Sequence, residues 1–464
     1  KAVLPRLRGA FALAIAFRAF PDFLIGARLG SPLVVGYGDG ETYLGSDALA
    51  LAPLTQKIAY LEEGDWVVVA RDGAQIFDKD NNPVTREVTT SGVSAAQIEK
   101  GNYRHYMQKE IFEQPKAVAD TLIGRLSDNN QIQLDEIHMS DKEIKAIKKI
   151  VVIACGTAYH AGMVAKYAIE KWAKIPVDVE IASEYRYRDP IVDANSLVIA
   201  ISQSGETMDL LMAVRHAKAN GARVLAVCNT NSSTIPRESD AVLYTHAGPE
   251  IAVASTKAFL TQIVAVYLIG LKLAQVRGEL SDQQVRSLYN EMLQLPGQVE
   301  QILETIEPLR ELTRKFVKNN TVLFLGRGIE YPVALEGALK LKELAYIHAE
   351  GFAGGELKHG PIALIEEGTA VIAILPSKDE HQLDEKMLSN IQEVKARGAR
   401  VIVIAEEGAE VIGAEHIIRI PASSPLFQPV LATVPLQVFA YEIAVARGTD
   451  VDQPRNLAKS VTVE

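Results

Sequence analysis

Buried strands and amphipathic helices alternate along most of this chain. Residues 197–201 form an uninterrupted apolar run that is rich in β-branched side chains, which predicts a strand buried on both faces. Apolar residues then recur at helical spacing over Met208–Ala219, which predicts a helix. The polar residues between them, 202–207, are therefore predicted to form a strand-to-helix turn.

The alternation contains an internal duplication. Val-Ile-Ala-Ile at residues 198–201 recurs letter for letter at residues 371–374, and Gly-Ala-Arg-Val at 221–224 recurs at 398–401. Two further pairs of strand-like runs keep the same order: 150–156 with 321–326, and 240–244 with 415–419. Repeats in one order at nearly constant spacing imply two copies of one domain.

Each copy favours a parallel sheet with helices on both faces, the doubly wound or flavodoxin-like α/β arrangement. Ligands of such sheets bind beyond the carboxyl ends of the strands, where the turn at residues 202–207 lies. Its counterpart in the second copy, residues 375–379, lacks the cluster of hydroxyl groups. We therefore expect only the first copy to hold a ligand at this turn.

Residues 1–98 have a different character, because short β-type runs alternate there with Gly and Asp turns. The apolar run at residues 10–17 follows three basic residues, as in a secretory signal, but Arg18 closes it and no polar cleavage region follows. We expect a buried strand there. The chain does not begin with Met, so we expect it to start inside a longer protein. Residues 89–94 read as a linker before a helix that begins near Tyr103.

Composition excludes several classes of partner. A chain of 464 residues predicts about three domains. The net charge of −10 and the lack of a long Lys/Arg run disfavour nucleic acid. The two cysteines, Cys155 and Cys228, lie in apolar strand-like runs without metal-ligand spacing, which favours a reduced, cytoplasmic setting over a zinc site. Polar residues interrupt the apolar segment 258–274, which predicts a buried helix and no membrane span.

The turn at residues 202–207 carries the first chemical hypothesis. Its Ser, Gln, Ser and Thr side chains and its glycine stand where a helix leaves backbone N–H groups unpaired, and those groups with the helix dipole favour an anion such as phosphate. An ordinary helix cap is the other interpretation, because Ser and Thr are common caps anywhere. No Gly-Lys-Ser/Thr or Gly-x-Gly-x-x-Gly pattern accompanies the turn, so a nucleotide is disfavoured.

Three further features have both an ordinary and a functional interpretation. Glu336, Lys340 and Glu343 share one face of a helix predicted over residues 332–346, either as exposed charge pairs or as acid–base groups. His359 stands in a glycine-bracketed loop over residues 351–361, where it is either a surface residue or a titrating group close to a ligand. The end of the chain has no periodicity, and such a tail is frayed by default.

Six motifs in one order resemble the glutamine–fructose-6-phosphate amidotransferases, the glucosamine-6-phosphate synthases, over essentially the whole chain. They are Cys-Gly-Thr at 155–157, the turn at 202–207, Val-Ala-Ser-Thr-Lys at 253–257, Ala-Leu-Lys-Leu-Lys-Glu at 338–343, residues 356–361 and the tail at 452–464. The resemblance implies two tandem sugar isomerase (SIS) domains after a class II glutaminase domain of the N-terminal-nucleophile type. It divides the chain into the end of the glutaminase domain with a linker (1–98), SIS domain 1 (99–285), SIS domain 2 (286–448) and an active-site tail (449–464).

The resemblance also implies a reaction and the residues that perform it. The family converts fructose 6-phosphate and glutamine-derived ammonia to glucosamine 6-phosphate, with no metal and no organic cofactor. Lys459 would form an imine with the open-chain ketone, Glu343 would move the proton between carbons 1 and 2 with Lys340 beside it, and His359 of the neighbouring subunit in a homodimer would open the ring. The residues expected to bind substrate are Gly156, Thr157, Ser202, Gln203, Ser204, Thr207, Val253, Ser255 and Ala458.

Two departures from the family pattern and two alternative functions remain. The family's glutaminase uses an N-terminal cysteine as its nucleophile, whereas this chain begins with Lys1, so we expect this chain not to hydrolyse glutamine. Ala158 stands where the better-known members have serine.

The chain could also be a non-catalytic phosphosugar-binding SIS protein, although no basic DNA-binding module accompanies it. A simple phosphosugar isomerase or deglycase is the other alternative.

Overall fold

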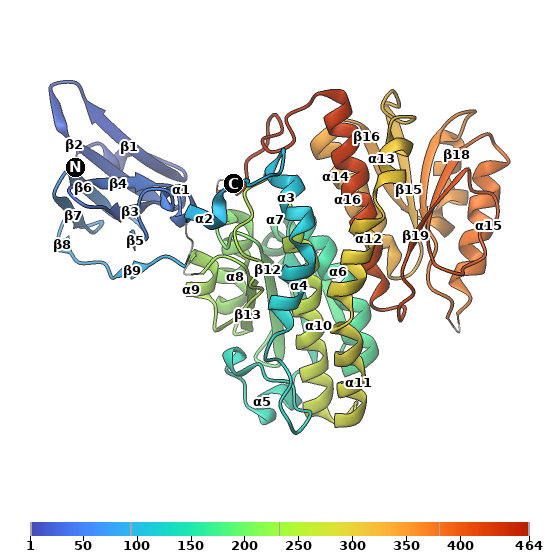
Figure 1. Ribbon diagram of the computed structural model, residues 1–464. Helices are drawn as coiled ribbons and strands as arrows, with labels where there is room; N and C mark the ends of the chain where they lie inside the picture. The colour runs from blue at the N-terminus through green and yellow to red at the C-terminus, as the bar shows by residue number, and fades with distance from the viewer. Residues whose placement is uncertain (1, 93–94, 232, 380, 463–464) are drawn as a thin grey trace.

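Two antiparallel sheets form the N-terminal part of the chain in the computed structural model, which describes residues 2–92, 95–231, 233–379 and 381–462 (Figure 1). The strand orders are β1-β2-β6-β7-β8 and β4-β3-β5-β9. The strands are β1 (Phe11–Phe17), β2 (Phe20–Leu29), β3 (Val34–Tyr37), β4 (Thr42–Gly45), β5 (Lys57–Tyr60), β6 (Trp66–Ala70), β7 (Gly73–Phe77), β8 (Pro83–Val84) and β9 (Val88–Thr90), with the short helices η1 (Leu4–Arg6) and α1 (Ala48–Leu51). Val35 of one sheet packs with Val67 and Ile76 of the other. We call these residues the N-terminal module, and its β-rich character was predicted.

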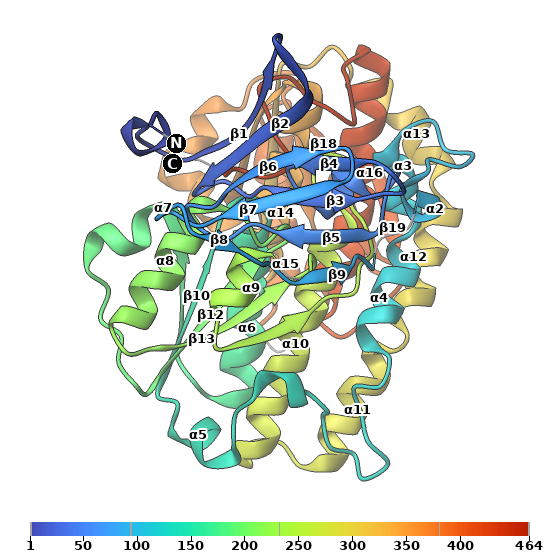
Figure 2. The same cartoon turned by 90° about the vertical axis from the view of Figure 1, so that its left-hand side faces the viewer.

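Two details of the module differ from the sequence prediction. The run at 10–17 forms strand β1, but no residue of Phe11–Phe17 is buried. The reason is that β1 is an edge strand that pairs only with β2, and the β1–β2 hairpin projects from the module (Figure 2). The predicted linker begins as a strand, because Val88–Thr90 pairs with β5 and Ser91 is buried. Residues 93 and 94 of that linker lie outside the described residues.

The rest of the chain forms two all-parallel sheets with one topology. The orders β11-β10-β12-β13-β14 and β16-β15-β17-β18-β19 are the same order, 2-1-3-4-5, in each copy. The strands are β10 (Lys149–Ala154), β11 (Val177–Ile181), β12 (Ser196–Ser202), β13 (Arg223–Cys228), β14 (Ala241–Tyr244), β15 (Thr321–Gly326), β16 (His348–Ala353), β17 (Ala370–Ile374), β18 (Arg400–Glu406) and β19 (His416–Ile420). The predicted duplication and the doubly wound fold class are confirmed.

Helices cover both faces of each sheet. Successive strand residues point to opposite faces, and the central strands are apolar at nearly every position, so both faces carry apolar side chains that must be buried. Val152 of β10 and Phe324 of β15 belong to one large core that the two domains share, whereas Val151 and Leu323 face two separate outer cores. Helices of both domains build the shared core between the sheets (Figure 1). The helices of this part are α2 (Ala95–Ile98), α3 (Tyr106–Phe112), α4 (Gln114–Leu122), α5 (Asp141–Ala146), α6 (Gly156–Ala173), α7 (Ala182–Tyr185), α8 (Met208–Ala219), α9 (Thr234–Glu238), α10 (Lys257–Arg277), α11 (Asp282–Met292), α12 (Leu295–Glu304), α13 (Glu307–Thr313), α14 (Glu330–Ala345), α15 (Leu383–Lys395) and α16 (Gln428–Arg447), with η2 (Asp135–Ile137), η3 (Arg186–Arg188), η4 (Gly354–His359) and η5 (Pro361–Leu364).

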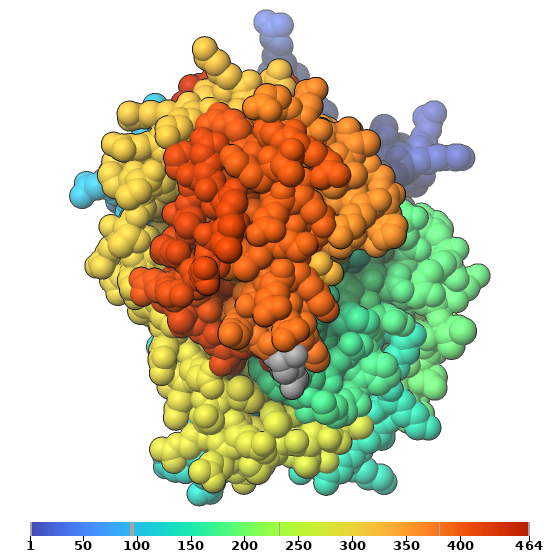
Figure 3. Space-filling view, turned by 90° about the vertical axis from the view of Figure 1, so that its right-hand side faces the viewer, coloured from blue at the N-terminus to red at the C-terminus, as the bar shows by residue number. Residues whose placement is uncertain are grey.

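The two most apolar helices, α10 and α16, form the centre of the shared core. Both are long and apolar enough to cross a membrane, but 89% and 83% of their most apolar windows are buried inside the protein. The prediction of a buried helix over residues 258–274 is confirmed. The second α/β domain lies on the far side of this helical layer from the N-terminal module, and its outer face is the surface seen in Figure 3.

Candidate active site

The turn after β12 is built around a glycine. Strand β12 ends at Ser202, helix α8 begins at Met208, and Gly205 between them has φ +69°, in the left-handed region. A Cβ atom on Gly205 would stand 2.0 Å from Ser233 Oγ, so no larger residue fits. The turn follows β12, whose neighbour in the sheet is β10, and the strand order reverses between these two strands. Doubly wound sheets bind their ligands at this point.

The hydroxyl groups of the turn are used in different ways. Ser202 Oγ accepts a hydrogen bond from the backbone N–H of Gly205 at 2.9 Å, and Ser204 Oγ accepts one from that of Glu206 at 3.2 Å. Thr207 occupies the N-cap position of α8, but its side chain makes no capping bond. The interpretation as an ordinary helix cap therefore fails for Thr207. Its hydroxyl lies at the start of the helix but accepts no capping hydrogen bond.

The C-terminal tail is anchored over this turn, contrary to the default of a frayed end. The first N–H of α8, on Met208, donates to the carbonyl of Val461 at 3.0 Å, and Ser31 Oγ donates to the carbonyl of Thr462 at 3.1 Å. At its start, the tail places Asp452 against α3, where the backbone N–H groups of Tyr106 and Met107 each donate to the carboxylate at 2.9 Å. The tail thus connects α3, the turn at residues 202–207 and the N-terminal module.

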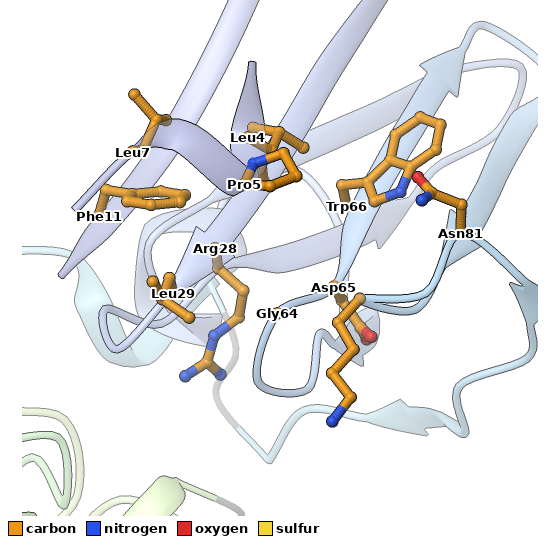
Figure 4. Close-up of a pocket in the computed structure, with 12 residues that line it drawn as sticks. Leu4, Pro5, Leu7, Phe11, Arg28, Leu29, Gly64, Asp65, Trp66 and Asn81 are labelled. Atoms are coloured by element: carbon orange, nitrogen blue, oxygen red, sulfur yellow. The ribbon is translucent and has the colours of Figure 1, made fainter. Parts of the chain in front are cut away.

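A cavity of about 670 Å³ is lined by residues of the tail, the turn and the N-terminal module. Four of the predicted site residues line it: Gln203, Ser204, Ala458 and Lys459. The opposite wall comes from the N-terminal module and includes residues 46–49, Tyr60 and residues 89–92. A smaller cavity of about 270 Å³ lies wholly inside the module, between Leu4, Arg28 and Trp66, and holds none of the predicted residues (Figure 4).

Lys459 is held at the cavity by a buried carboxylate that the sequence analysis did not single out. Its Nζ atom lies 2.7 Å from Glu250 Oε2 and donates to the carbonyl of Ala252 at 2.8 Å. Burial alone would raise the pKa of Glu250, but the charge of Lys459, its hydrogen bond and the N–H groups of Thr256 and Ala258 lower it below the ordinary value. Glu250 is therefore an anion that fixes Lys459 as its partner.

A second cluster joins the two α/β domains between α6 and α14. Lys340 Nζ lies 2.5 Å from Glu343 Oε2 and 3.5 Å from Glu336 Oε1, and it donates to Thr157 Oγ1 at 3.1 Å. Thr157 in turn donates to Glu336 Oε1 at 3.0 Å, and His160 Nδ1 lies 2.7 Å from Glu336 Oε2. The cluster brings Thr157, which was predicted to bind substrate near the phosphate, into direct contact with Lys340.

Burial decides between the two interpretations of this helix face. The side chains of Lys340 and Glu336 are 0% and 1% exposed and that of Glu343 is 21% exposed, so the interpretation as solvated charge pairs is wrong. Burial alone would lower the pKa of Lys340, but the carboxylates of Glu343 and Glu336 outweigh it, and the pKa is raised. Glu250 is among the charges that raise it, so the two clusters act on each other.

Three further predicted residues, Gly156, Val253 and Ser255, and the departure at Ala158 have their own surroundings. Gly156 is the first residue of α6, is exposed and has φ +54°. The backbone N–H of Val253 donates to the carbonyl of Asp452 at 2.9 Å, which ties the Val253 motif to the tail. Ser255 Oγ is buried without a hydrogen-bond partner among the described residues. Ala158 is also buried, so a serine hydroxyl there would face protein.

Comparison with known proteins places the chain in a family. The SIS domain model matches residues 143–272 and 315–447. The glutamine–fructose-6-phosphate aminotransferase (isomerizing) of Streptomyces coelicolor is 57% identical over 465 residues, which cover 100% of this chain and 76% of that protein. The chain belongs to the glutamine–fructose-6-phosphate aminotransferase family. The Corynebacterium diphtheriae member is 55% identical over 463 residues, covering 99% of this chain and 74% of that protein.

Solved structures agree with this family assignment. The C-terminal domain of glucosamine–fructose-6-phosphate aminotransferase from Francisella tularensis superposes with a TM-score of 0.73 at 43% identity, covering 76% of this chain and 100% of that one. A protein described as a phosphosugar isomerase from Silicibacter pomeroyi gives a TM-score of 0.62 at 26% identity, covering 75% of this chain and 99% of that one. The predicted resemblance and the pair of SIS domains are confirmed.

His359 is a predicted site residue that belongs neither to the lining of the cavity nor to the Lys340 cluster. His359 ends the η4 helix of the second SIS domain and is exposed. Within the part of the chain that the structure describes, no hydrogen bond or ion pair joins it to Glu343 or Lys459. The predicted loop is also shorter than expected, because Gly351 belongs to β16 (His348–Ala353).

Sequence reasoning missed three residues that hold the predicted ones: Glu250, His160 and Glu110. Glu250 stands three positions before Val253, so an acidic residue next to a recognised motif was the available signal. His160 stands three positions after Thr157, on the same face of α6. Glu110 had no comparable signal, since it contacts only the backbone N–H groups of Ile251 and Ala252, the two residues before the Val253 motif.

Proposed function

We propose that this chain converts fructose 6-phosphate and ammonia to glucosamine 6-phosphate, as the names of its relatives describe. The turn of Ser202, Gln203, Ser204 and Thr207 holds the phosphate at the start of α8. Lys459 forms a C–N bond with carbon 2 of the open-chain sugar as the ketone oxygen leaves as water, and ammonia later takes the place of the lysine. SIS domain 1 therefore binds the sugar phosphate, and SIS domain 2 supplies the acid–base groups.

The observation that carries this proposal is the position of Lys459. Its amine lies on the wall of the same cavity as Gln203 and Ser204, although the tail and the turn are separated by more than half of the chain. An amine beside an anion-binding turn suits a phosphorylated carbonyl compound, because the phosphate fixes the carbonyl near the nucleophile. A non-catalytic phosphosugar-binding protein needs the turn but not the lysine.

Glu343 moves a proton between carbons 1 and 2 of the sugar in this proposal. Its partly exposed carboxylate is held by the buried ammonium of Lys340, which also stabilises enolic charge. Thr157 and the backbone of Gly156 lie near the phosphate, and Val253 and Ser255 contact the sugar. The free hydroxyl of Ser255 supports that role.

His359 acts in a neighbouring subunit, which makes the enzyme a homodimer. Its exposure in the single chain supports this arrangement, because a residue that completes another subunit's site must lie on the surface. The ammonia comes from glutamine in the family, and we propose the same source here. Both cysteines are free, which supports a cytoplasmic setting.

Product analysis tests the proposed function. The chain is incubated with fructose 6-phosphate, with and without ¹⁵N-ammonium chloride, and the sugar phosphates are identified by mass spectrometry. We expect ¹⁵N-labelled glucosamine 6-phosphate only with ammonium. Conversion to glucose 6-phosphate alone would instead assign a simple isomerase, and binding without conversion would assign a sugar-phosphate sensor.

Loss of two hydroxyls should weaken the phosphate site. Ser204→Ala with Thr207→Ala removes two donors from the turn, and hydrogen bonds to charged groups contribute about 1.5–3 kcal/mol each. Calorimetry should therefore show fructose 6-phosphate binding weaker by a few kcal/mol. The control is Thr305→Ala with Ser389→Ala, which removes two exposed hydroxyls from the second half of the chain. Equal affinity in a folded double variant of the turn would exclude this phosphate site.

A further inference from the structure

Glu110 is a buried carboxyl group beside the residues that hold Lys459. It lies on α3 and is 2% exposed. Its Oε1 atom accepts hydrogen bonds from the backbone N–H groups of Ile251 at 2.5 Å and Ala252 at 3.2 Å. Its Oε2 atom is buried and has no hydrogen-bond partner among the described residues. One oxygen of the carboxyl group thus binds the backbone of residues 251 and 252, while the other has no hydrogen-bond partner among the described residues.

The segment that Glu110 holds is the one that positions Lys459. Glu250 and the carbonyl of Ala252 are the two partners of the Lys459 amine. The same helix α3 receives Asp452 of the tail at its first turn, and the carbonyl of Asp452 accepts from Val253. Helix α3 therefore fixes the start of the tail and, through Glu110, the segment against which Lys459 rests.

The charges around Glu110 favour its uncharged form. Burial is the largest effect and the negative charge of Glu250 adds to it, and together they raise the pKa of Glu110 to about 8 against the opposing charges of Lys459 and Lys257. Lys257 on α10 is itself paired with Glu113 at 2.7 Å. If Glu110 were ionised, a second buried negative charge would lie beside Glu250. Its Oε2 atom has no hydrogen-bond partner among the described residues, so burying that charge would cost free energy.

We propose that Glu110 is a positioning residue for Lys459: as an uncharged carboxyl it fixes the backbone of residues 250–252, so that Glu250 remains the single anion paired with the amine. This proposal rests on the proposed function, because it concerns the lysine that forms the imine. Glu110 is not among the residues that line the cavity. It acts by holding the acceptors of the Lys459 amine in place.

Borohydride trapping with two variants tests this proposal. Borohydride delivers hydride to carbon 2 of the protonated imine and leaves a stable secondary amine on Lys459. Glu110→Ala removes the acceptor for two N–H groups, and displacement of the amine should slow trapping with fructose 6-phosphate by up to roughly 10²-fold. Glu110→Gln keeps a neutral oxygen acceptor and should trap at least about tenfold faster than Glu110→Ala. Glu99→Ala, an exposed change shortly before α3, is the matched control and should trap at the wild-type rate.

The outcomes separate this proposal from the proposed function. An adduct at Lys459 in the wild type with equally fast trapping in Glu110→Ala overturns the positioning role and leaves the imine intact. Trapping in Glu110→Gln as slow as in Glu110→Ala shows that the charge of Glu110 is needed, which also overturns the proposal. No adduct at Lys459 in the wild type overturns the proposed function itself.

Thermal unfolding provides an independent measurement of the uncharged form. Glu110 keeps its proton in the folded chain up to about pH 8, whereas a glutamate in the unfolded chain ionises near pH 4.3. At this group the unfolded state therefore binds fewer protons in this window, and the contribution of Glu110 to stability falls as pH rises from 5 to 8. The Tm of Glu110→Gln relative to the wild type should rise over that window by on the order of a few degrees and then level off. A constant difference in Tm between pH 5 and 9 overturns the uncharged assignment.

Discussion

Replacing Lys459 by arginine should abolish conversion of fructose 6-phosphate while the protein stays folded. Arginine keeps the positive charge opposite Glu250 but cannot form an imine, because its guanidinium remains protonated. We expect a loss of at least roughly 10⁴-fold, above the 10²–10⁴-fold that one positioned acid–base group contributes. Product formation with ammonium is the measurement.

Two controls distinguish loss of the amine from loss of structure. Lys342→Arg makes the same change at an exposed position on α14 and should leave turnover unaffected. Trimming the chain after Leu457 removes Lys459 but retains Asp452, which caps α3, so the two SIS domains should remain folded. Production of glucosamine 6-phosphate at the intact rate by Lys459→Arg or by the trimmed chain would leave the tail with a structural role only.

Glu343→Gln should stop proton movement on the sugar without preventing binding. The amide has the shape of the carboxylate but cannot accept the carbon 1 proton, so exchange of that proton with deuterated water should fall by roughly 10²–10⁴-fold. Binding of fructose 6-phosphate should persist, because the phosphate turn lies on α8 and not on α14. Proton NMR in deuterated water measures the exchange.

A matched change elsewhere completes this experiment. Glu385→Gln removes an exposed carboxylate from α15 of the same domain and should leave exchange unaltered. Loss of exchange in Glu385→Gln to the same extent would mean that the assay reports general damage to the domain. Exchange at the wild-type rate in Glu343→Gln would assign the proton shuttle to another residue.

The fold could be read from the sequence where local pattern and burial agree. The predicted strand at 197–201 is β12 (Ser196–Ser202), and the predicted helix Met208–Ala219 has those bounds, because a strand of a covered parallel sheet is apolar throughout and its neighbouring helix is amphipathic. The pattern failed at β1, whose alternation of small and large apolar residues resembles a buried strand. Whether another layer covers a strand is a tertiary property that its own residues do not contain.

The site was only partly readable for the same reason. The hydroxyl turn and the Glu336–Lys340–Glu343 face are local patterns, and the structure places each in a buried or enclosed setting. The pairing of Lys459 with Glu250 joins positions 209 residues apart, and helix or strand periodicity predicts contacts only between residues close in sequence. The same holds for the bond between Met208 and Val461, which gives the tail its order.

Trapping followed by peptide mapping tests the central claim most directly. The chain is mixed with fructose 6-phosphate and borohydride, digested, and the mass of every lysine-containing peptide is compared with that of an untreated sample. The imine at Lys459 predicts one hexitol phosphate adduct, on the tail peptide, at Lys459 and at neither Lys340 nor Lys342. An adduct on α14, or no adduct in a chain that binds the sugar, would contradict this account.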